Sequence, residues 1–295
     1  MSPEVAKISP TENREIKVSN LEMVGWSIPK EGRTVNQDRF LILPAVGLAA
    51  VFDGVGSSGG ERAAIIAEDT TRKWFNTKVE NRAAVFDKDD AEGLVRDCMY
   101  TIHDNILESK GEDAQTTGVI AFLWRDTSSK EYITFGSVGD SRAYEKEEGG
   151  DIEQIGFDDG IIKSLLDQKE VTMDEAKELQ NKMNNITNRE EFTAWMEYDI
   201  FHLRNKLTQI LGDDPINPKI TTIERKPKRK YLLATDGVTD NLTDKEINSI
   251  LSAEELNNPQ QVDKLIESSS ARSKENHLRA KSDDMTAVII DPGQL

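Results

Sequence analysis

Two aspartates in this sequence each follow an apolar run and precede a glycine, a pattern that places a carboxylate at the end of a strand. The first run, LAAVF, leads to Asp53 and Gly54, and the second, KYLLAT, leads to Asp236 and Gly237. If the two strands belong to one sheet, the two carboxylates lie close together and repel each other away from bulk water. The pattern therefore predicts a cation between them.

Three further aspartates occupy similar positions next to strand-like segments. They are Asp38 before RFLIL, Asp140 at the end of GSVGD, and Asp283 just before MTAVII. A single aspartate in such a place is most often a turn former or a helix cap, but several of them without cysteine or histidine form an oxygen-rich set. Mg²⁺ and Mn²⁺ prefer carboxylate and water ligands of this kind. We therefore expect a divalent metal site suited to activating water and neutralising a phosphoryl group.

Composition narrows the classes of partner. The chain has 295 residues and a net charge of −17, so it can form a large core, but nucleic acid, whose binding needs basic clusters, is not an expected partner. Cys98 is the only cysteine, which excludes an internal disulfide and favours a core residue over a nucleophile. No apolar stretch reaches membrane-spanning length and the first residues lack a hydrophobic signal core. We therefore expect a cytoplasmic protein without a membrane partner.

The order of the expected elements favours an α+β sheet sandwich over a doubly wound parallel sheet. Strand-like segments follow one another at 21–28, 39–43 and 47–52, which indicates antiparallel pairing. Helical patterns at 61–78 and 88–110 come next, and strands return from residue 116. Residues 1–20 show no periodicity, so we expect a loose tail or an edge strand there.

The segment 157–210 differs from the rest of the chain because it is polar, charged and helix-prone. Thr172 and Glu175 have the spacing of a capping box at the start of a helix within it. We interpret this segment as an excursion from the core. The remaining expected elements are strands at 219–225, 230–236 and 285–290 and helices at 243–251 and 259–274.

The sequence GVGSSG at 54–59 also matches the G-x-G-x-x-G pattern of dinucleotide-binding proteins. That pattern requires a helix that returns to a parallel strand within ~30 residues, whereas here a second helix follows the first. An acid directly before the first glycine would also repel a pyrophosphate. We therefore discount a nucleotide-binding function.

Seven short motifs, in this order, resemble the metal-dependent protein phosphatase 2C (PPM) family of serine/threonine phosphatases, particularly its bacterial members. They are RTVNQD at 33–38, AVFDG at 50–54, TTG at 116–118, GDSR at 139–142, LG at 211–212, LATDG at 233–237 and SDDMT at 282–286. Each motif alone has low specificity, but their joint order over residues 20–290 is specific. The resemblance implies an α-β-β-α sandwich of two antiparallel sheets between helix pairs. Residues 21–295 would form the phosphatase domain, with 157–210 as its flap.

The resemblance also implies metal ligands at individual positions. Asp53 would bridge two ions of Mg²⁺ or Mn²⁺, and the Gly54 carbonyl oxygen would also coordinate. Asp236 and Asp283 would complete the ligands of the second ion. Asp38 would act at the metal site directly or through water.

Two further positions complete the implied site. Asp140, together with Asp236, resembles the position of a third ion in bacterial members. Arg33 would hold the substrate phosphate, a role that suits a guanidinium able to bind two oxygens at once. The implied reaction is the in-line attack of a metal-bridged hydroxide on the phosphorus of phosphoserine or phosphothreonine proteins. A cognate serine/threonine kinase is then a candidate partner.

The sequence departs from the family pattern near these residues. Position 37 is glutamine where glutamate is usual, and Asp284 stands where many members carry asparagine, so we assign it no ligand role. Residues 55–60 contain no histidine, whereas the family commonly has one there as a general acid, a contribution of about 10²- to 10⁴-fold. An alternative function is a catalytically weak regulatory scaffold. Retention of mutually repelling carboxylates argues for catalysis instead.

Overall fold

The computed structural model describes residues 12–18, 21–56, 59–79, 84–109 and 114–293. Its strands are β1 Glu12–Val18, β2 Leu21–Ile28, β3 Arg39–Leu43, β4 Leu48–Phe52, β5 Gly54–Val55, β6 Gln115–Thr116, β7 Gly118–Arg125, β8 Glu131–Val138, β9 Arg142–Glu147, β10 Ile152–Gln154, β11 Lys219–Glu224, β12 Arg229–Ala234 and β13 Met285–Asp291. Its α-helices are α1 Gly60–Lys78, α2 Lys88–Glu108, α3 Ile161–Asp167, α4 Met173–Asn185, α5 Trp195–His202, α6 Asp236–Thr239, α7 Asp244–Leu251 and α8 Asn258–Arg272. Two short 3-10 helices span Pro44–Val46 and Arg189–Glu191.

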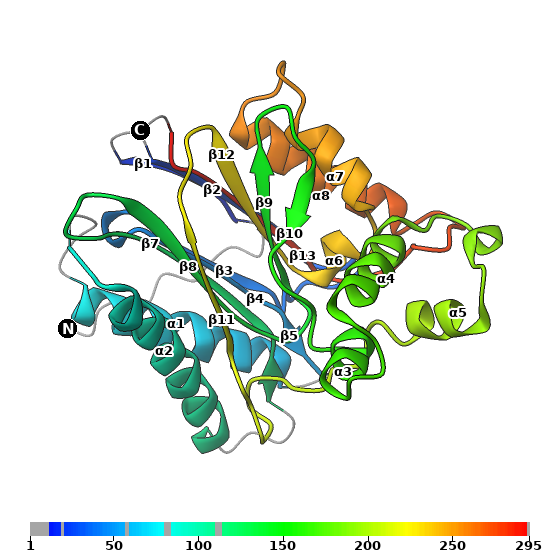
Figure 1. Cartoon of the computed structure of the whole chain (residues 1–295), viewed down its shortest axis with the longest axis horizontal. Coiled ribbons are helices and arrows are strands. Elements are labelled where there is room, and N and C mark those ends of the chain that lie inside the picture. The colour runs from blue at the N-terminus through cyan, green and yellow to red at the C-terminus, as the bar shows by residue number, and fades with distance from the viewer. Residues whose placement is uncertain (1–11, 19–20, 57–58, 80–83, 110–113, 294–295) are drawn as a thin grey trace.

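Two antiparallel sheets lie face to face, with α1 and α2 outside one and α7 and α8 outside the other (Figure 1). The six-stranded sheet has the order β1-β2-β13-β12-β9-β10, and the five-stranded sheet has the order β11-β8-β7-β4-β3. A separate two-stranded ribbon pairs β5 with β6. This architecture confirms the expected α-β-β-α sandwich.

Successive side chains of a single strand contribute to different apolar layers of the sandwich. In β4, Phe52 packs with residues of α1 and α2, whereas its neighbour Val51 packs between the two sheets. In β2, Met23 lies between the sheets and Val24 packs with residues of α7 and α8. Successive side chains of a strand point to opposite faces, so one buried strand can serve two layers.

The structure corrects one expectation about topology. The strands that precede Asp53 and Asp236 do not share a sheet, because β4 belongs to the five-stranded sheet and β12 to the six-stranded sheet. The expectation is wrong because an apolar run identifies a buried strand but not the sheet that the strand joins. Neighbouring strands in the described sheets are antiparallel throughout, which removes the parallel unit that a dinucleotide site needs.

The N-terminal segment contributes an edge strand. Residues 12–18 form β1, which pairs with β2 from Glu12 opposite Ser27 to Val18 opposite Leu21. This is one of the two alternatives for residues 1–20. The other residues of that segment, 1–11 and 19–20, lie outside the described residues.

Residues 157–210, here called the helical insertion, contain α3, α4 and α5 beside one end of the sandwich (Figure 1). The predicted capping box is confirmed, because Thr172 Oγ1 accepts from the Glu175 amide at 3.3 Å and the Glu175 carboxylate accepts from the Thr172 amide at 2.8 Å. The insertion has a small apolar core of its own that includes Met183, Ile200 and Phe201.

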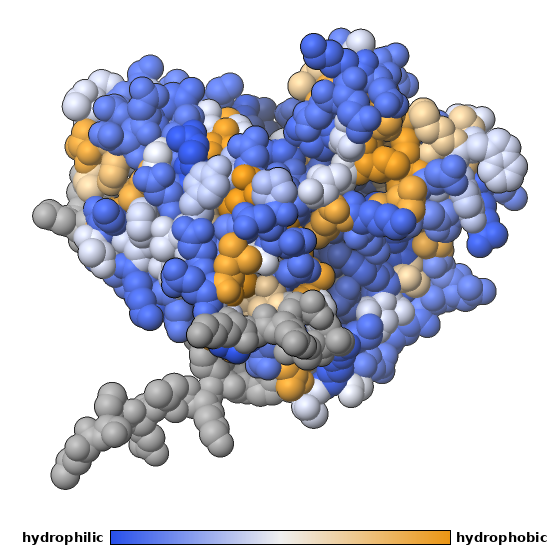
Figure 2. Space-filling model, turned by 90° about the horizontal axis from the view of Figure 1, so that it is seen from below, coloured by the Kyte–Doolittle hydropathy of each residue, from blue (hydrophilic) through white to orange (hydrophobic). Residues whose placement is uncertain are grey.

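The surface is largely charged and polar. On the face shown in Figure 2, hydrophilic residues predominate and hydrophobic residues form separate small patches. This distribution agrees with the composition, in which 31% of residues are charged. In the part of the chain that the structure describes, no helix combines the length and the apolar character needed to cross a bilayer.

Candidate active site

Asp53 lies between the buried strand β4 and the short strand β5, where the backbone is crowded. A Cβ atom on Gly54 would lie 2.4 Å from the Gly60 carbonyl oxygen and 2.6 Å from the Gln37 carbonyl oxygen, so only glycine fits there. The Asp53 carbonyl accepts a hydrogen bond from the Thr117 amide at 2.8 Å. The backbone that carries the Asp53 carboxylate is therefore fixed by close packing at Gly54 and by the hydrogen bond from Thr117.

Asp140 and Asp236 reach the same place from two other strand ends. Asp140 lies between β8 and β9, and Asp236 begins α6 just after β12. One carboxylate oxygen from each of Asp53, Asp140 and Asp236 lies within 4.8 Å of the other two. These three residues, here called the acidic cluster, bring together carboxylates from both sheets. A Cβ atom on Gly237 would lie 1.8 Å from the Asp284 carbonyl oxygen, so the start of α6 also requires glycine.

Asp38 is buried close to the acidic cluster and is held by two hydroxyl groups. Its Oδ2 accepts hydrogen bonds from Thr235 Oγ1 at 2.8 Å and from Thr286 Oγ1 at 2.7 Å. Its Oδ1 is buried and has no hydrogen-bond partner among the described residues. An unsatisfied buried carboxylate oxygen is costly, so this atom is suited to bind a ligand that brings positive charge.

Burial and mutual repulsion raise the pKa values of these aspartates. For Asp53 and for Asp140, burial raises the pKa most, and the charge of Asp236 raises it further. Burial also raises the pKa of Asp38, with a second contribution from Asp284. Carboxyl groups in this state are stabilised by a proton or by a metal cation. The electrostatics of the cluster therefore favour cation binding.

Lys281 lies next to the acidic cluster, a position that sequence reasoning missed. Its Nζ forms an ion pair with Asp236, and it lies 3.2 Å from Asp283 Oδ2 and 3.4 Å from Asp240 Oδ2. Burial alone would lower the pKa of Lys281, but these three carboxylates raise it. The only signal in the sequence was the place of Lys281 two residues before Asp283.

Asp283 is less tightly placed than the other predicted ligands. Its side chain keeps 36% exposure, and it is not one of the three residues whose oxygens converge. It does approach the cluster indirectly, because it shares the Lys281 ammonium with Asp236. A role for Asp283 as a metal ligand therefore stays a prediction.

Arg33 is exposed and is oriented by Gln37. Its Nη1 donates to Gln37 Oε1 at 2.7 Å, and Gln37 Nε2 donates to the Gly56 carbonyl at 2.9 Å. Asp284 fixes the backbone of the same loop, because its two carboxylate oxygens accept from the amides of Lys30 at 2.5 Å and Gln37 at 2.6 Å. Asp284 thus has a structural role that the sequence did not reveal.

The three histidines form contacts away from the acidic cluster in the described residues. His103 Nδ1 accepts from the Gly212 amide at 3.1 Å, and its Nε2 lies 3.0 Å from Asp214. His277 Nδ1 accepts from the Arg279 amide, and His202 packs against an aromatic ring in α5. The expectation that none of them replaces the missing general acid agrees with these positions.

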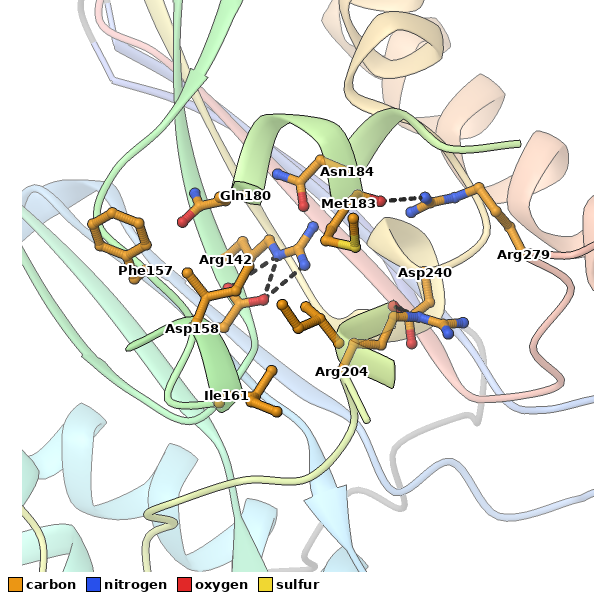
Figure 3. A pocket seen from close by; sticks show the side chains of 13 residues that line it. Arg142, Phe157, Asp158, Ile161, Gln180, Met183, Asn184, Arg204, Asp240 and Arg279 are labelled. Atoms are coloured by element: carbon orange, nitrogen blue, oxygen red, sulfur yellow. Dashed lines mark hydrogen bonds and ion pairs between the residues drawn. The ribbon is translucent and has the colours of Figure 1, made fainter. Parts of the chain in front are cut away.

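Arginine–aspartate pairs join the surroundings of the cluster to the helical insertion (Figure 3). Arg142 binds both oxygens of Asp158, with Nη2 at 2.7 Å from Oδ2. Arg204 Nε donates to Asp240 Oδ1 at 2.9 Å. Arg279 is buried and donates to backbone carbonyls of both α4 and α6. The insertion is therefore tied to residues adjacent to Asp236.

The residues present fit a hard divalent cation. The converging donors are carboxylate oxygens from three chain segments, and Asp236 Oδ1, like Asp38 Oδ1, is buried without a hydrogen-bond partner among the described residues. All-oxygen donor sets are typical of Mg²⁺ and Mn²⁺ sites. Among the described residues that converge there, none is a cysteine or histidine of the kind that favours zinc or copper.

Comparisons with solved structures show similar folds in other proteins. Similar folds occur in the serine/threonine phosphatase PstP of Mycobacterium tuberculosis (TM-score 0.66, 19% identity, 93% of this chain and 99% of that chain) and in Stp1 of Staphylococcus aureus (TM-score 0.69, 21% identity, 95% and 98%). The PstP catalytic domain in complex with two manganese ions gives a TM-score of 0.64 at 20% identity, covering 92% and 97%. None of the curated proteins matches by sequence. Residues 30–281 match the sequence profile described as protein phosphatase 2C, and the chain therefore belongs to this family of protein phosphatases.

Proposed function

We propose that this protein is a Mg²⁺- or Mn²⁺-dependent serine/threonine phosphatase that hydrolyses phosphoserine and phosphothreonine in proteins. The observation that carries the proposal is the convergence of Asp53, Asp140 and Asp236, whose oxygens lie within 4.8 Å of one another. A solved structure of similar fold, the PstP catalytic domain, binds two manganese ions. We infer two ions here as well, with Asp140 and Asp236 as a candidate third position.

The charges of the site explain why a phosphatase with this cluster would need metal ions. A phosphate monoester is an anion, and the acidic cluster would repel it at short range. Divalent ions, when bound, supply the compensating charge and a nucleophilic water near neutral pH. Without them, the cluster would exclude the phosphate that we propose Arg33 binds.

The chain's own residues then position the substrate and the ions. Asp53, Gly54 and Asp236 would hold the ions, and Thr235 and Thr286 keep Asp38 oriented with one oxygen free. Arg33, steadied by Gln37, would bind the phosphate oxygens. Since no histidine lies at the cluster, we infer that aryl phosphates, whose leaving groups need little protonation, are hydrolysed more readily than alkyl phosphates.

Hydrolysis of p-nitrophenyl phosphate with and without Mn²⁺ tests this proposal. EDTA should abolish activity and added Mn²⁺ should restore it, while Asp53→Asn and Asp236→Asn should each lose roughly a hundredfold or more. Asp104→Asn, an exposed substitution on α2, is the matched control and should retain activity. Turnover that persists under chelation would refute a metal-dependent mechanism. Absence of turnover with Mn²⁺ would favour the regulatory scaffold instead.

We further propose that the helical insertion selects protein substrates. Trp195 and Met196 on α5 are 84% and 51% exposed, so two consecutive large apolar side chains of the insertion are accessible to a protein substrate. Trp195→Ala with Met196→Ala should change the preference among phosphoproteins without changing hydrolysis of small aryl phosphates. If both activities fall together, the insertion is structural. A cytoplasmic location and a kinase partner stay predictions.

A further inference from the structure

Lys281 is held firmly beside the acidic cluster by its backbone as well as by its charge. The Lys281 amide donates to Asn241 Oδ1 at 3.0 Å, and Asn241 Nδ2 donates back to the Lys281 carbonyl at 2.9 Å. Asn241 Nδ2 also donates to the Gly237 carbonyl at 2.8 Å, next to Asp236. One buried amide side chain therefore fixes the position of Lys281 relative to the turn that carries Asp236.

The ammonium of Lys281 contacts carboxylates that the proposed function assigns to a metal ion. It pairs with Asp236 and lies 3.2 Å from Asp283 Oδ2, and its side chain is only 18% exposed. A divalent ion bound by the same two carboxylates would stand close to this ammonium and be repelled by it. The lysine and that ion therefore cannot both keep these contacts.

Asp240 offers the ammonium a second position. Its Oδ2 is buried, forms no hydrogen bond in the described residues and lies 3.4 Å from Lys281 Nζ. Its Oδ1 is already occupied by Arg204 of the helical insertion (Figure 3). A lysine displaced from Asp236 can move toward this free oxygen without entering solvent, so displacement is possible without unfolding the loop.

We propose that Lys281 is a tethered cation that competes with one divalent ion for Asp236 and Asp283. It stabilises the metal-free protein by partly neutralising the carboxylates, and it weakens binding of the ion that these two residues would hold. Ions bound elsewhere in the site are affected less. The inference rests on the proposed metal dependence. Lys281 would determine the Mn²⁺ concentration at which the site fills.

Calorimetric titration of the full chain with Mn²⁺ tests the proposal without measuring activity. Lys281→Met keeps the length of the side chain and removes its charge. It should bind the Mn²⁺ ion that Asp236 and Asp283 would hold at least roughly tenfold more tightly. Lys281→Arg, which keeps the charge, should not gain affinity. Lys88→Met, the same change of net charge at an exposed position on α2, should bind like the unsubstituted protein.

Thermal unfolding provides a second readout. In EDTA, Lys281→Met should have a Tm lower by roughly 3 °C, because Asp236 loses its ammonium partner and Asp240 keeps the Arg204 contact but loses the nearby ammonium. Saturating Mn²⁺ should raise its Tm more than it raises that of the unsubstituted protein. If Lys281→Met does not fold, as judged by circular dichroism, Lys281→Gln replaces it in both measurements.

The outcomes separate this inference from the proposed function. Unchanged or weaker Mn²⁺ binding by Lys281→Met, while the unsubstituted protein binds Mn²⁺, overturns the competition and leaves metal dependence intact. Failure of both proteins to bind Mn²⁺ overturns both. Tighter binding by Lys281→Met alone, with Lys88→Met and Lys281→Arg showing no gain, supports the proposal.

Discussion

The carboxylate of Asp38 accepts a hydrogen bond from Thr286 Oγ1 at 2.7 Å, although Asp38 precedes a strand of the five-stranded sheet and Thr286 belongs to the six-stranded sheet. Thr235, just after β12, binds the same oxygen at 2.8 Å. The two sheets are therefore joined at the site by hydroxyl groups that use one carboxylate oxygen and leave the other free. In the proposed metal site these hydroxyl groups would orient a ligand, and substitution of such orienting groups typically lowers metal affinity by about 10- to 100-fold.

Thr286→Val should weaken both the sandwich and the metal site. Valine keeps the branched shape but cannot donate to Asp38, so we expect a loss of about 1–3 kcal/mol in the free energy of unfolding. Mn²⁺ affinity should fall roughly tenfold, because Asp38 loses one of the two hydroxyl groups that orient it. Urea unfolding in EDTA and calorimetry measure the two effects.

The control for this substitution is Thr222→Val. Thr222 shares a hydroxyl pair with Thr134 at 2.9 Å between β11 and β8, away from the acidic cluster. It should lose stability but keep its affinity for Mn²⁺. Equal Mn²⁺ affinity in Thr286→Val and Thr222→Val would show that the hydroxyl at position 286 does not orient a ligand.

Sequence patterns were sufficient for the fold and for part of the site. Apolar runs ending at Asp53, Asp140 and Asp236 identified all three residues of the acidic cluster, because a strand end is visible in local composition. The same runs could not show that β4 and β12 lie in different sheets, since pairing depends on partners distant in the chain.

Two residues beside the cluster were missed for the same reason. Lys281 contacts Asp236 from 45 positions away, and a lysine in a polar loop resembles any solvated lysine. Asp284 acts on the backbone amides of Lys30 and Gln37, which leave no trace in the sequence because every residue except proline has an amide. Long-range contacts of this kind become visible only in the folded chain.

Asp284→Asn should loosen the loop that carries Arg33. Both carboxylate oxygens of Asp284 accept from backbone amides, and an amide side chain can accept at only one of these positions. The unmatched amide should cost about 1–3 kcal/mol. Hydrogen exchange over residues 30–37 should accelerate, and the KM for aryl phosphate should rise more than kcat falls. Exchange that is unchanged in this loop would contradict the assigned role.

Gln37 should matter through two separate hydrogen bonds, one to Arg33 and one to the Gly56 carbonyl. Gln37→Leu removes both, so Arg33 loses its orientation and the KM should rise by roughly tenfold. Gln37→Glu keeps an acceptor for Arg33 but cannot donate to Gly56, and its KM should lie between those of the other two proteins. Steady-state kinetics with p-nitrophenyl phosphate give the order. A Gln37→Leu variant with an unchanged KM would mean that Arg33 needs no support from position 37.

The metal-free protein should become more stable as pH falls below neutrality. Burial and neighbouring carboxylates raise the folded-state pKa values of Asp38, Asp53 and Asp140, so the folded protein binds protons more readily than the unfolded chain. The resulting stabilisation is complete below the ordinary aspartate pKa and is lost as pH rises through the raised values. Acidic groups with lowered pKa, such as Glu197 at about 2, act in the opposite sense only at lower pH. Burial and the charge of Arg272 lower the pKa of His277, so this one imidazole opposes the three aspartates within the same pH range.

Thermal unfolding between about pH 7.5 and pH 5 checks this dependence. In EDTA, the Tm should rise on acidification. Asp53→Asn should reduce the slope of Tm against pH, because it removes one carboxyl group with a raised pKa. With saturating Mn²⁺ the slope should flatten or reverse, since protons then compete with the ion for the same oxygens. A Tm in EDTA that stays constant or falls over this range would mean that burial and mutual repulsion do not raise the pKa values of these carboxyl groups, and the electrostatic reason for a bound cation would be lost.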